Sequence, residues 1–253
     1  MTHNAMSAQS EGWAAANQTH GIAKQLEDGV RGMMLDLHYR DPETNRNVPE
    51  RIETATVIDQ VALCHASCLL GHRRLLEGLC DITAFLDANA GEVLTIIFET
   101  NVADADLDEV LRASGIAERA FVHAPGAPWP TLQELIDTDK RVVIFVEKGG
   151  GTPPYLHPAF TGNVWDTPYS FEKKEDFSCR LNRGKAGDPL FLVNHWIGPV
   201  PKIDFARDVN GEAVLGARVE ECTKEAGRAP TFVGVDFYEV GDLFSVVKKA
   251  NGL

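Results

Sequence analysis

Strand-length apolar runs that alternate with amphipathic helical segments constrain the fold of this chain more than any other feature. The segments 92–99 (EVLTIIFE) and 141–148 (RVVIFVEK) are almost continuously apolar, as strands are when both faces of their sheet are covered. The segment 104–115, which lies between them, begins with acidic residues, which favour the first turn of a helix. Strands that alternate with helices predict an α/β fold with a parallel sheet.

The whole pattern predicts one barrel domain over residues 1–253. The strand candidates are 29–39, 61–65, 92–99, 141–148, 163–165, 190–195 and 231–238, and the helix candidates are 72–92, 104–115, 131–139, 211–224 and 239–252. Seven strand candidates come close to the eight of a β/α barrel, a fold that typically needs about 250 residues. The sequence has no GxGxxG after a first strand, so a dinucleotide-binding fold lacks its main support.

Charge and hydropathy limit the partners. The chain has 37 acidic and 24 basic residues and a formal net charge of −13. This balance argues against nucleic acid as a partner and against a polybasic membrane anchor, but it allows brief contact of a few apolar loop residues with a lipid surface. No apolar run approaches the ~20 residues that span a bilayer, and the start shows no signal-peptide pattern.

The five cysteines do not define a metal site. Cys64 and Cys68 flank a histidine in CHASC, but no second pair completes a tetrahedral zinc set. An odd number of cysteines in a chain of this length gives no strict disulfide framework. We expect buried thiols or one to two disulfides.

Ionisable or strongly polar groups stand at the ends of nearly all strand candidates, and the carboxyl ends of barrel strands form the rim where catalysis takes place. In 29–39 the period of two puts Asp36 and His38 on one face and apolar side chains on the other. A buried carboxylate such as Asp36 needs a metal ion or a cationic partner. The rim groups are Asp36, His38, His65, Glu99, Glu147, Lys148, Asn194, His195 and Asp236.

These motifs together resemble the phosphatidylinositol-specific phospholipase C X-domain family of phosphodiesterases, above all its secreted single-domain members. The motifs are THNAMS, QLEDGVRGMMLDLHY, LCHASCLLG, FLDANAGEVLTIIFE, RVVIFVE, LVNHW and FVGVDFY. The resemblance covers essentially the whole chain and implies an irregular TIM-type β/α barrel. It also implies a phosphoinositide or related phospholipid substrate, transient contact with a membrane surface, a monomer, and an extracellular or extracytoplasmic location.

By this resemblance, His3 in the THN turn and His65 in LCH form an acid–base pair. The inositol 2-hydroxyl attacks the phosphodiester and loses a proton, and the diacylglycerol oxygen leaves and gains one. Two imidazoles can do both. The product would be a cyclic inositol phosphate. The alternatives are a phosphodiesterase of the same fold that acts on another phospholipid or a glycerophosphodiester, and an inactive protein that binds head groups or partners. The presence of both histidines argues against the inactive alternative.

The resemblance also implies a Ca²⁺ site made by Asn4, Asp36 and Glu99. All three offer oxygen ligands, which suit a hard cation, and no arginine replaces Asp36 as it does in metal-independent members. Many calcium-dependent members carry a further acid two residues before the strand aspartate. This chain has Met34 there, so water and substrate would complete the shell.

The remaining expectations concern substrate contacts and the start of the chain. His38, Lys148, Asn194 and His195 are expected to bind substrate, and Asp236 either contacts a substrate hydroxyl or orients His3. Trp13, Trp165 and Trp196 are expected to pack in the core, with contact to lipid or sugar as the alternative. Only two residues precede His3, so the first strand of the family's barrel is expected to be missing and its neighbouring strands to have exposed edges.

Overall fold

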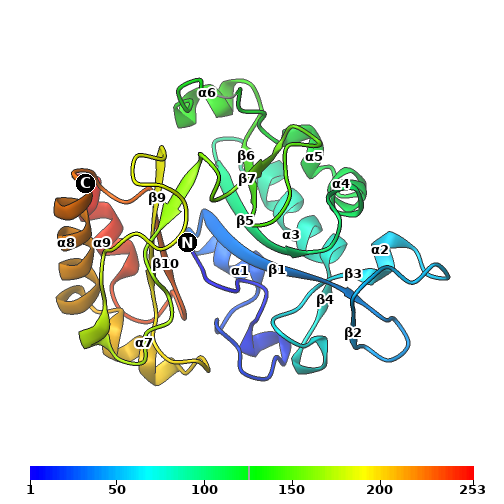
Figure 1. Cartoon of the computed structure of the whole chain (residues 1–253), viewed down its shortest axis with the longest axis horizontal. Helices are drawn as coiled ribbons and strands as arrows, with labels where there is room; N and C mark the ends of the chain where they lie inside the picture. Colours follow the sequence, from blue (N-terminus) through cyan, green and yellow to red (C-terminus); the bar gives the residue numbers. More distant parts are fainter. Residues whose placement is uncertain (125) are drawn as a thin grey trace. The chain divides into compact units, whose positions relative to one another are not determined.

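The structure, a computed structural model, describes residues 1–124 and 126–253 and divides into two compact units (Figure 1). Unit 1 comprises Met1–His3, Ala15–Thr19 and Ala159–Leu253, and unit 2 comprises Asn4–Ala14 and His20–Pro158. The expectation of a single domain stays a prediction.

Unit 2 is built on a seven-stranded sheet in the order β4-β3-β1-β5-β6-β7, with β2 paired to β1. Strands β1, β5, β6 and β7 are parallel, and their register places Asp36 opposite Glu99. The apolar runs of β5 and β6 are almost wholly buried. The strands are β1 (Gly32–Arg40), β2 (Asn47–Val48), β3 (Val61–Leu63), β4 (Arg73–Arg74), β5 (Leu94–Asn101), β6 (Val142–Val146) and β7 (Leu156–Pro158).

One strand runs against the sequence prediction, because β3 pairs with β1 in antiparallel orientation. The chain between them, residues 41–60, forms the short β2 and a single helical turn, α2 (Val57–Gln60). Strand β2 is itself antiparallel to β1. The connection therefore doubles back at one edge of the sheet. A parallel pair would instead need a long connection, usually a helix, that crosses a face of the sheet.

Helices α1, α3 and α4 of unit 2 pack in a row along one side of this sheet (Figure 1). The amphipathic helix predicted at 72–92 is observed as α3, where Leu75, Leu79, Ile82 and Leu86 are buried. A capping box between Thr131 and Glu134 starts α6. The other bounds are η1 (Gln9–Glu11), α1 (Ile22–Glu27), η2 (Cys68–Leu70), α3 (Leu75–Ala88), α4 (Asp104–Ala113), α5 (Ile116–Arg119) and α6 (Leu132–Asp137).

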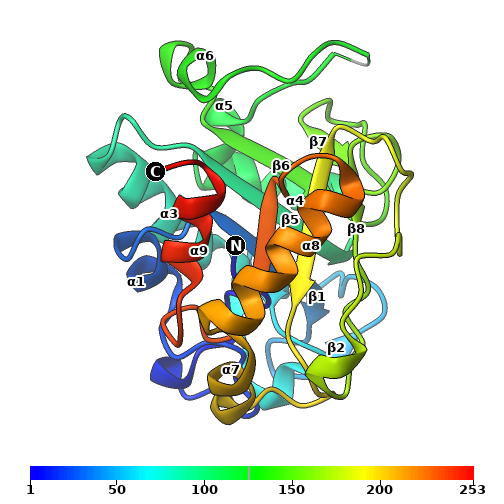
Figure 2. The same ribbon diagram turned by 90° about the vertical axis from the view of Figure 1, so that its left-hand side faces the viewer.

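Unit 1 contains a parallel three-stranded sheet in the order β10-β9-β8. Figure 2 shows α8 and α9 on one face of this sheet, where Val219, Cys222 and Val246 are buried. The bounds are β8 (Val164–Asp166), η3 (Lys174–Asp176), β9 (Leu190–His195), α7 (Ile203–Val209), the π-helical η4 (Glu212–Gly216), α8 (Ala217–Ala226), β10 (Phe232–Val235) and α9 (Leu243–Ala250).

The start of the chain pairs with β10. Thr2 forms a parallel bridge with Val235, and the amide of His3 donates to the Val235 carbonyl at 3.0 Å. The sequence predicts that the first barrel strand is missing. The structure has a single β-bridge, between Thr2 and Val235, next to β10. His3 follows that bridge directly and is tied to the end of β10.

Two disulfides cross-link the chain, one in each unit. They join Cys64 to Cys68 and Cys179 to Cys222, while Cys80 is an exposed thiol. Among the described residues, none of the helices combines the length and the apolar character needed to cross a membrane.

Candidate active site

In unit 1, His3 is held by three side chains. Its Nδ1 lies 2.8 Å from Oδ1 of Asp236, and the Asn17 amide donates to that same oxygen at 3.0 Å. The indole of Trp196 stacks on the imidazole, with ring centroids 3.8 Å apart and planes 6° apart. Nδ2 of Asn17 also lies 3.4 Å from Nδ1 of His3. The contact with the carboxylate is shorter and a carboxylate only accepts, so we assign the ring proton of neutral His3 to Nδ1, which leaves Nε2 as the basic nitrogen. This arrangement suits a general base.

Two of these contacts were not predicted. Asn17 lies in the short segment 15–19, which carries no strand or helix pattern, so nothing in the sequence points to it. Trp196 was expected to pack in the core, and it is only 8% exposed. One face of its indole nevertheless stacks on the imidazole of His3. Its position directly after His195, at the end of β9, is the signal that could have identified it.

In unit 2, the antiparallel course of β3 brings His65 back to the middle of β1. The Cys64 amide donates to the Asp36 carbonyl at 3.2 Å. Nδ2 of the buried Asn4 lies 3.2 Å from Nδ1 of His65. An amide nitrogen only donates, so Nδ1 of His65 accepts and its proton sits on Nε2. This tautomer is the one that suits a general acid.

The loop that carries His65 is clamped at both ends. The Cys64–Cys68 disulfide closes it, and the side chain of Asn47 bridges it. The Asn47 amide donates to the Ala66 carbonyl at 3.1 Å and accepts from the Cys68 amide at 2.8 Å. Because β2 supplies Asn47, the hairpin edge of the sheet fixes the position of the histidine loop.

Three carboxylates lie on or directly after the parallel strands of unit 2. Asp36 on β1 and Glu99 on β5 are register partners, and Glu147 follows β6, where its amide donates to the Phe98 carbonyl at 2.9 Å. Burial raises the pKa of Asp36 well above its usual value, and the charges of Glu99 and Glu147 raise it further. The sequence marked Glu147 as a rim group but did not place it among the metal ligands.

The residue types of the predicted ligand set suit a hard divalent cation. Carboxylate and amide oxygens are the ligands that Ca²⁺ prefers, and a cation would relieve the repulsion that raises the pKa of Asp36. No group of three His, Cys, Asp or Glu side chains in the described part of the chain is arranged to hold a metal. The predicted ligand set has only two such residues, Asp36 and Glu99, and the amide of Asn4 is its third member.

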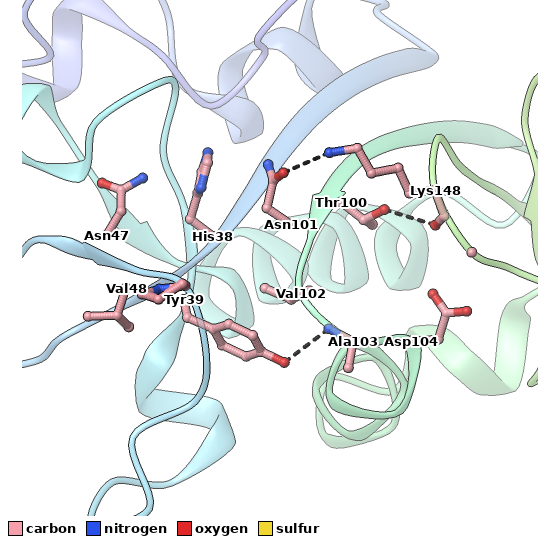
Figure 3. Close-up of a pocket in the computed structure, with 12 residues that line it drawn as sticks. His38, Tyr39, Asn47, Val48, Thr100, Asn101, Val102, Ala103, Asp104 and Lys148 are labelled. Atoms are coloured by element: carbon pink, nitrogen blue, oxygen red, sulfur yellow. Dashed lines mark hydrogen bonds between the residues drawn. The ribbon is translucent and has the colours of Figure 1, made fainter.

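His38 and Lys148 line one open cavity of about 750 Å³ at the ends of β1, β5 and β6 (Figure 3). The Lys148 ammonium donates to Oδ1 of Asn101 at 2.9 Å. Burial lowers the pKa of His38, while the nearby Glu99 carboxylate partly opposes that shift. A cavity with a neutral imidazole, an ammonium and carboxamides suits a polar, hydroxyl-rich or anionic ligand.

Asn194 and His195 are fully buried within unit 1. The Asn194 amide donates to Asp166 at 3.0 Å and to the Thr167 carbonyl at 2.7 Å. His195 pairs with the Val209 carbonyl at 2.9 Å and lies 3.3 Å from the Arg218 guanidinium. Their assignment to substrate binding stays a prediction. The contacts described here give both side chains a role inside the protein.

His195 predicts a pH-dependent loss of stability. Burial and the neighbouring Arg218 lower its pKa to about 3. Between that value and the unfolded pKa of about 6.5, only the unfolded state binds the proton, so acidification favours unfolding. Between pH 7 and pH 5, the free energy of unfolding measured with urea should fall by about 2 kcal/mol more in wild type than in His195→Gln. Equal losses in both proteins would contradict this account of His195.

Comparison with known proteins gives a consistent family. The PI-PLC X family model (PI-PLC X 1) matches residues 2–251. A PI-PLC X domain-containing protein 1 from Arthroderma benhamiae is 29% identical over 261 residues, which cover 94% of this chain and 79% of the relative. An uncharacterized secreted protein of the same fungus is 26% identical over 94% of this chain and 57% of its own length.

A solved structure shares the fold. The phosphatidylinositol-specific phospholipase C of S. aureus, solved in a study of its membrane binding, aligns with a TM-score of 0.61 at 15% identity. The alignment covers 100% of this chain and 91% of that protein. The TIM-type α/β fold predicted from the sequence is therefore confirmed. In this structure the strands of the fold form two sheets.

Proposed function

The chain belongs to the PI-PLC X-domain family, and we propose that it cleaves the phosphodiester of phosphatidylinositol-type lipids, releasing diacylglycerol and a cyclic inositol phosphate. One observation carries the proposal. Nδ1 of His3 lies 2.8 Å from a carboxylate oxygen, which is closer than the Asn17 amide at 3.4 Å, whereas Nδ1 of His65 lies 3.2 Å from the amide nitrogen of Asn4. Opposite tautomers suit a reaction in which one imidazole takes a proton and the other gives one.

In the proposed reaction, Nε2 of His3 removes the proton of the inositol 2-hydroxyl. The resulting oxygen nucleophile attacks the phosphorus, and the bond from phosphorus to the diacylglycerol oxygen breaks. Nε2–H of His65 gives its proton to that leaving oxygen. The Asn4 contact with Nδ1 of His65 supports the role of His65 as the acid.

We propose that Ca²⁺ is held by Asn4, Asp36 and Glu99, with Glu147 adding negative charge nearby. Because Asn4 uses Nδ2 toward His65, its Oδ1 is the atom that would meet the ion. When bound, Ca²⁺ would neutralise the phosphate charge and lower the pKa of the attacking hydroxyl. Asn4 would then contact the ion through Oδ1 and Nδ1 of His65 through Nδ2, so the residue that binds the metal would also fix the tautomer of His65.

Substrate contacts and location complete the proposal. His38 and Lys148 would meet the inositol hydroxyls or the phosphate in the unit 2 cavity. Two disulfides are typical of proteins from oxidising compartments, and a relative is named a secreted protein. Both support an extracytoplasmic location.

A head-group panel tests the proposal. The protein is incubated separately with phosphatidylinositol, phosphatidylcholine and a glycerophosphodiester, and head-group release is measured. We expect release from phosphatidylinositol only. Release from the glycerophosphodiester alone would assign a different substrate to the same fold, and no release from any of the three would contradict enzymatic function.

A further inference from the structure

The imidazole of His3 needs support on its face as well as a hydrogen bond. Asp236 and Asn17 both contact the ring at Nδ1, and contacts at one atom leave a ring able to turn about that atom. A general base must hold its basic nitrogen within hydrogen-bond distance of the proton that it takes. The flat stack of Trp196 on the imidazole, at a centroid distance of 3.8 Å, removes this rotation.

Trp196 can hold His3 in place only if its own ring is held. The ring of Tyr169 lies beside the indole, with centroids 6.3 Å apart and planes 28° apart, which is within the usual range for an aromatic pair. Tyr169 belongs to the segment 167–170, which follows β8 and has no regular secondary structure. Its ring is 39% exposed, so packing in the core does not account for its position.

The guanidinium of Arg183 supports the ring of Tyr169 in turn. It lies 4.8 Å from the centroid of Tyr169 and 3.9 Å from that of Phe160, and a cation is attracted to the face of an aromatic ring. Nε and Nη2 of Arg183 both donate to Oδ2 of Asp166, at 3.0 and 2.7 Å. Asp166 is fully buried at the end of β8. Two hydrogen bonds to a buried carboxylate fix the plane of the guanidinium.

We propose that Tyr169 and Arg183 are positioning residues for His3 and that they act through Trp196. The groups of His3, Trp196, Tyr169 and Arg183 form one series of contacts within unit 1, which we call the stacked column. Asp236 holds the His3 end of the stacked column, and Asp166 holds the Arg183 end. The inference rests on the proposed function, in which His3 is the base. The competing role for the exposed Tyr169 is direct contact with substrate, and the two roles predict different kinetics.

The kinetic test compares Tyr169→Leu, which removes the aromatic ring, with Tyr169→Phe, which keeps it. Phe244→Leu is the matched control, because Phe244 is 38% exposed in the same unit and pairs with Tyr238 at a centroid distance of 6.1 Å. Steady-state kinetics on a water-soluble inositol phosphodiester separate kcat from KM. We expect Tyr169→Leu to lower kcat by about three- to tenfold, the worth of one aromatic pair, with KM unchanged. Tyr169→Phe and Phe244→Leu should match wild type.

A double-variant cycle tests whether the effect passes through Trp196. Trp196→Leu should lower kcat by about 10²-fold, as expected when a reacting group is misplaced. In that background, Tyr169→Leu should cause no further loss. Arg183→Lys keeps a positive charge for Asp166 but loses the planar contact with Tyr169. It should lower kcat as Tyr169→Leu does, and the two changes together should cost no more than either alone.

Proton NMR of the histidine rings gives a measurement that does not depend on activity. The ring current of an indole stacked on an imidazole moves the signals of the imidazole protons upfield. The signals of His3 are those that disappear in His3→Ala. They should move to ordinary values in Trp196→Leu, move part of the way in Tyr169→Leu, and stay in place in Phe244→Leu.

Several results would overturn the inference. A raised KM in Tyr169→Leu, or an equal loss of activity in Tyr169→Phe, would assign Tyr169 to direct contact with substrate. Additive losses in the cycle would show that Tyr169 does not act through Trp196, and unchanged His3 signals in Tyr169→Leu would show that it does not position the imidazole. If wild type cleaves no inositol phosphodiester but the His3 signals respond as expected, the proposed function fails and the stacked column stands.

Discussion

His65→Ala should lower kcat by about 10²–10⁴-fold, the usual contribution of a general acid–base group. The expectation follows from the contact of Nδ1 with the Asn4 amide, which keeps the ring proton on Nε2 for the leaving oxygen. His3→Ala should cause a loss of the same order through the missing base. Steady-state kinetics on phosphatidylinositol vesicles measure both effects.

The two histidines can be told apart by the leaving group. An inositol phosphodiester with a nitrophenyl leaving group needs little protonation as it departs, so it should restore much of the activity of His65→Ala. It should not restore His3→Ala, because the attacking hydroxyl still needs a base. His123→Ala removes an imidazole elsewhere in unit 2 and serves as the control. Equal restoration of both catalytic variants would contradict the assigned roles.

Removal of calcium should cost activity on a comparable scale. Charge stabilisation by a catalytic metal is worth several kcal/mol, so EGTA should lower the wild-type rate on the order of 10²-fold or more. Asp36→Asn should show the same loss in the presence of calcium and no further response to EGTA. Asp137→Asn, which alters an exposed carboxylate on α6, should behave as wild type.

Asp36 also predicts an effect on stability that does not depend on activity. Its raised pKa means that the folded state holds a proton that the unfolded state releases. The metal-free protein therefore loses stability as the pH rises above the usual Asp pKa of about 4 and through the raised folded value. At neutral pH, calcium should raise the melting temperature of wild type but not of Asp36→Asn. A calcium shift of equal size in both proteins would place the ion elsewhere.

The sequence predicts best those elements whose pattern is local. The strand predicted at 190–195 is observed over the same residues, and the apolar runs of β5 and β6 are found within two residues of their predicted limits. The helix predicted at 72–92 is observed as α3, over Leu75–Ala88. Very short elements such as β2 and α2 were missed, because a strand of two residues or a single turn shows no periodicity.

The site could be predicted only in part, because much of it depends on contacts between distant residues. The hydrogen bond between the side chains of Asn17 and Asp236 joins residues 219 positions apart, and no local sequence pattern predicts it. The antiparallel direction of β3 brings Cys64, the residue before His65, into a backbone hydrogen bond with Asp36, whereas the alternation of strands and helices predicts a parallel strand. The sequence shows which polar residue types lie at the strand ends. Which of these side chains contact one another can be seen only in the folded structure.

Attack by the 2-hydroxyl is tested most directly by the phosphorus NMR spectrum of the products that the purified protein forms from phosphatidylinositol with calcium. We expect the signal of a cyclic inositol phosphate, formed while diacylglycerol accumulates. Loss of the lipid signal with only an acyclic inositol phosphate from the first time point would contradict attack by the 2-hydroxyl. An unchanged lipid signal would contradict the proposed activity as a whole.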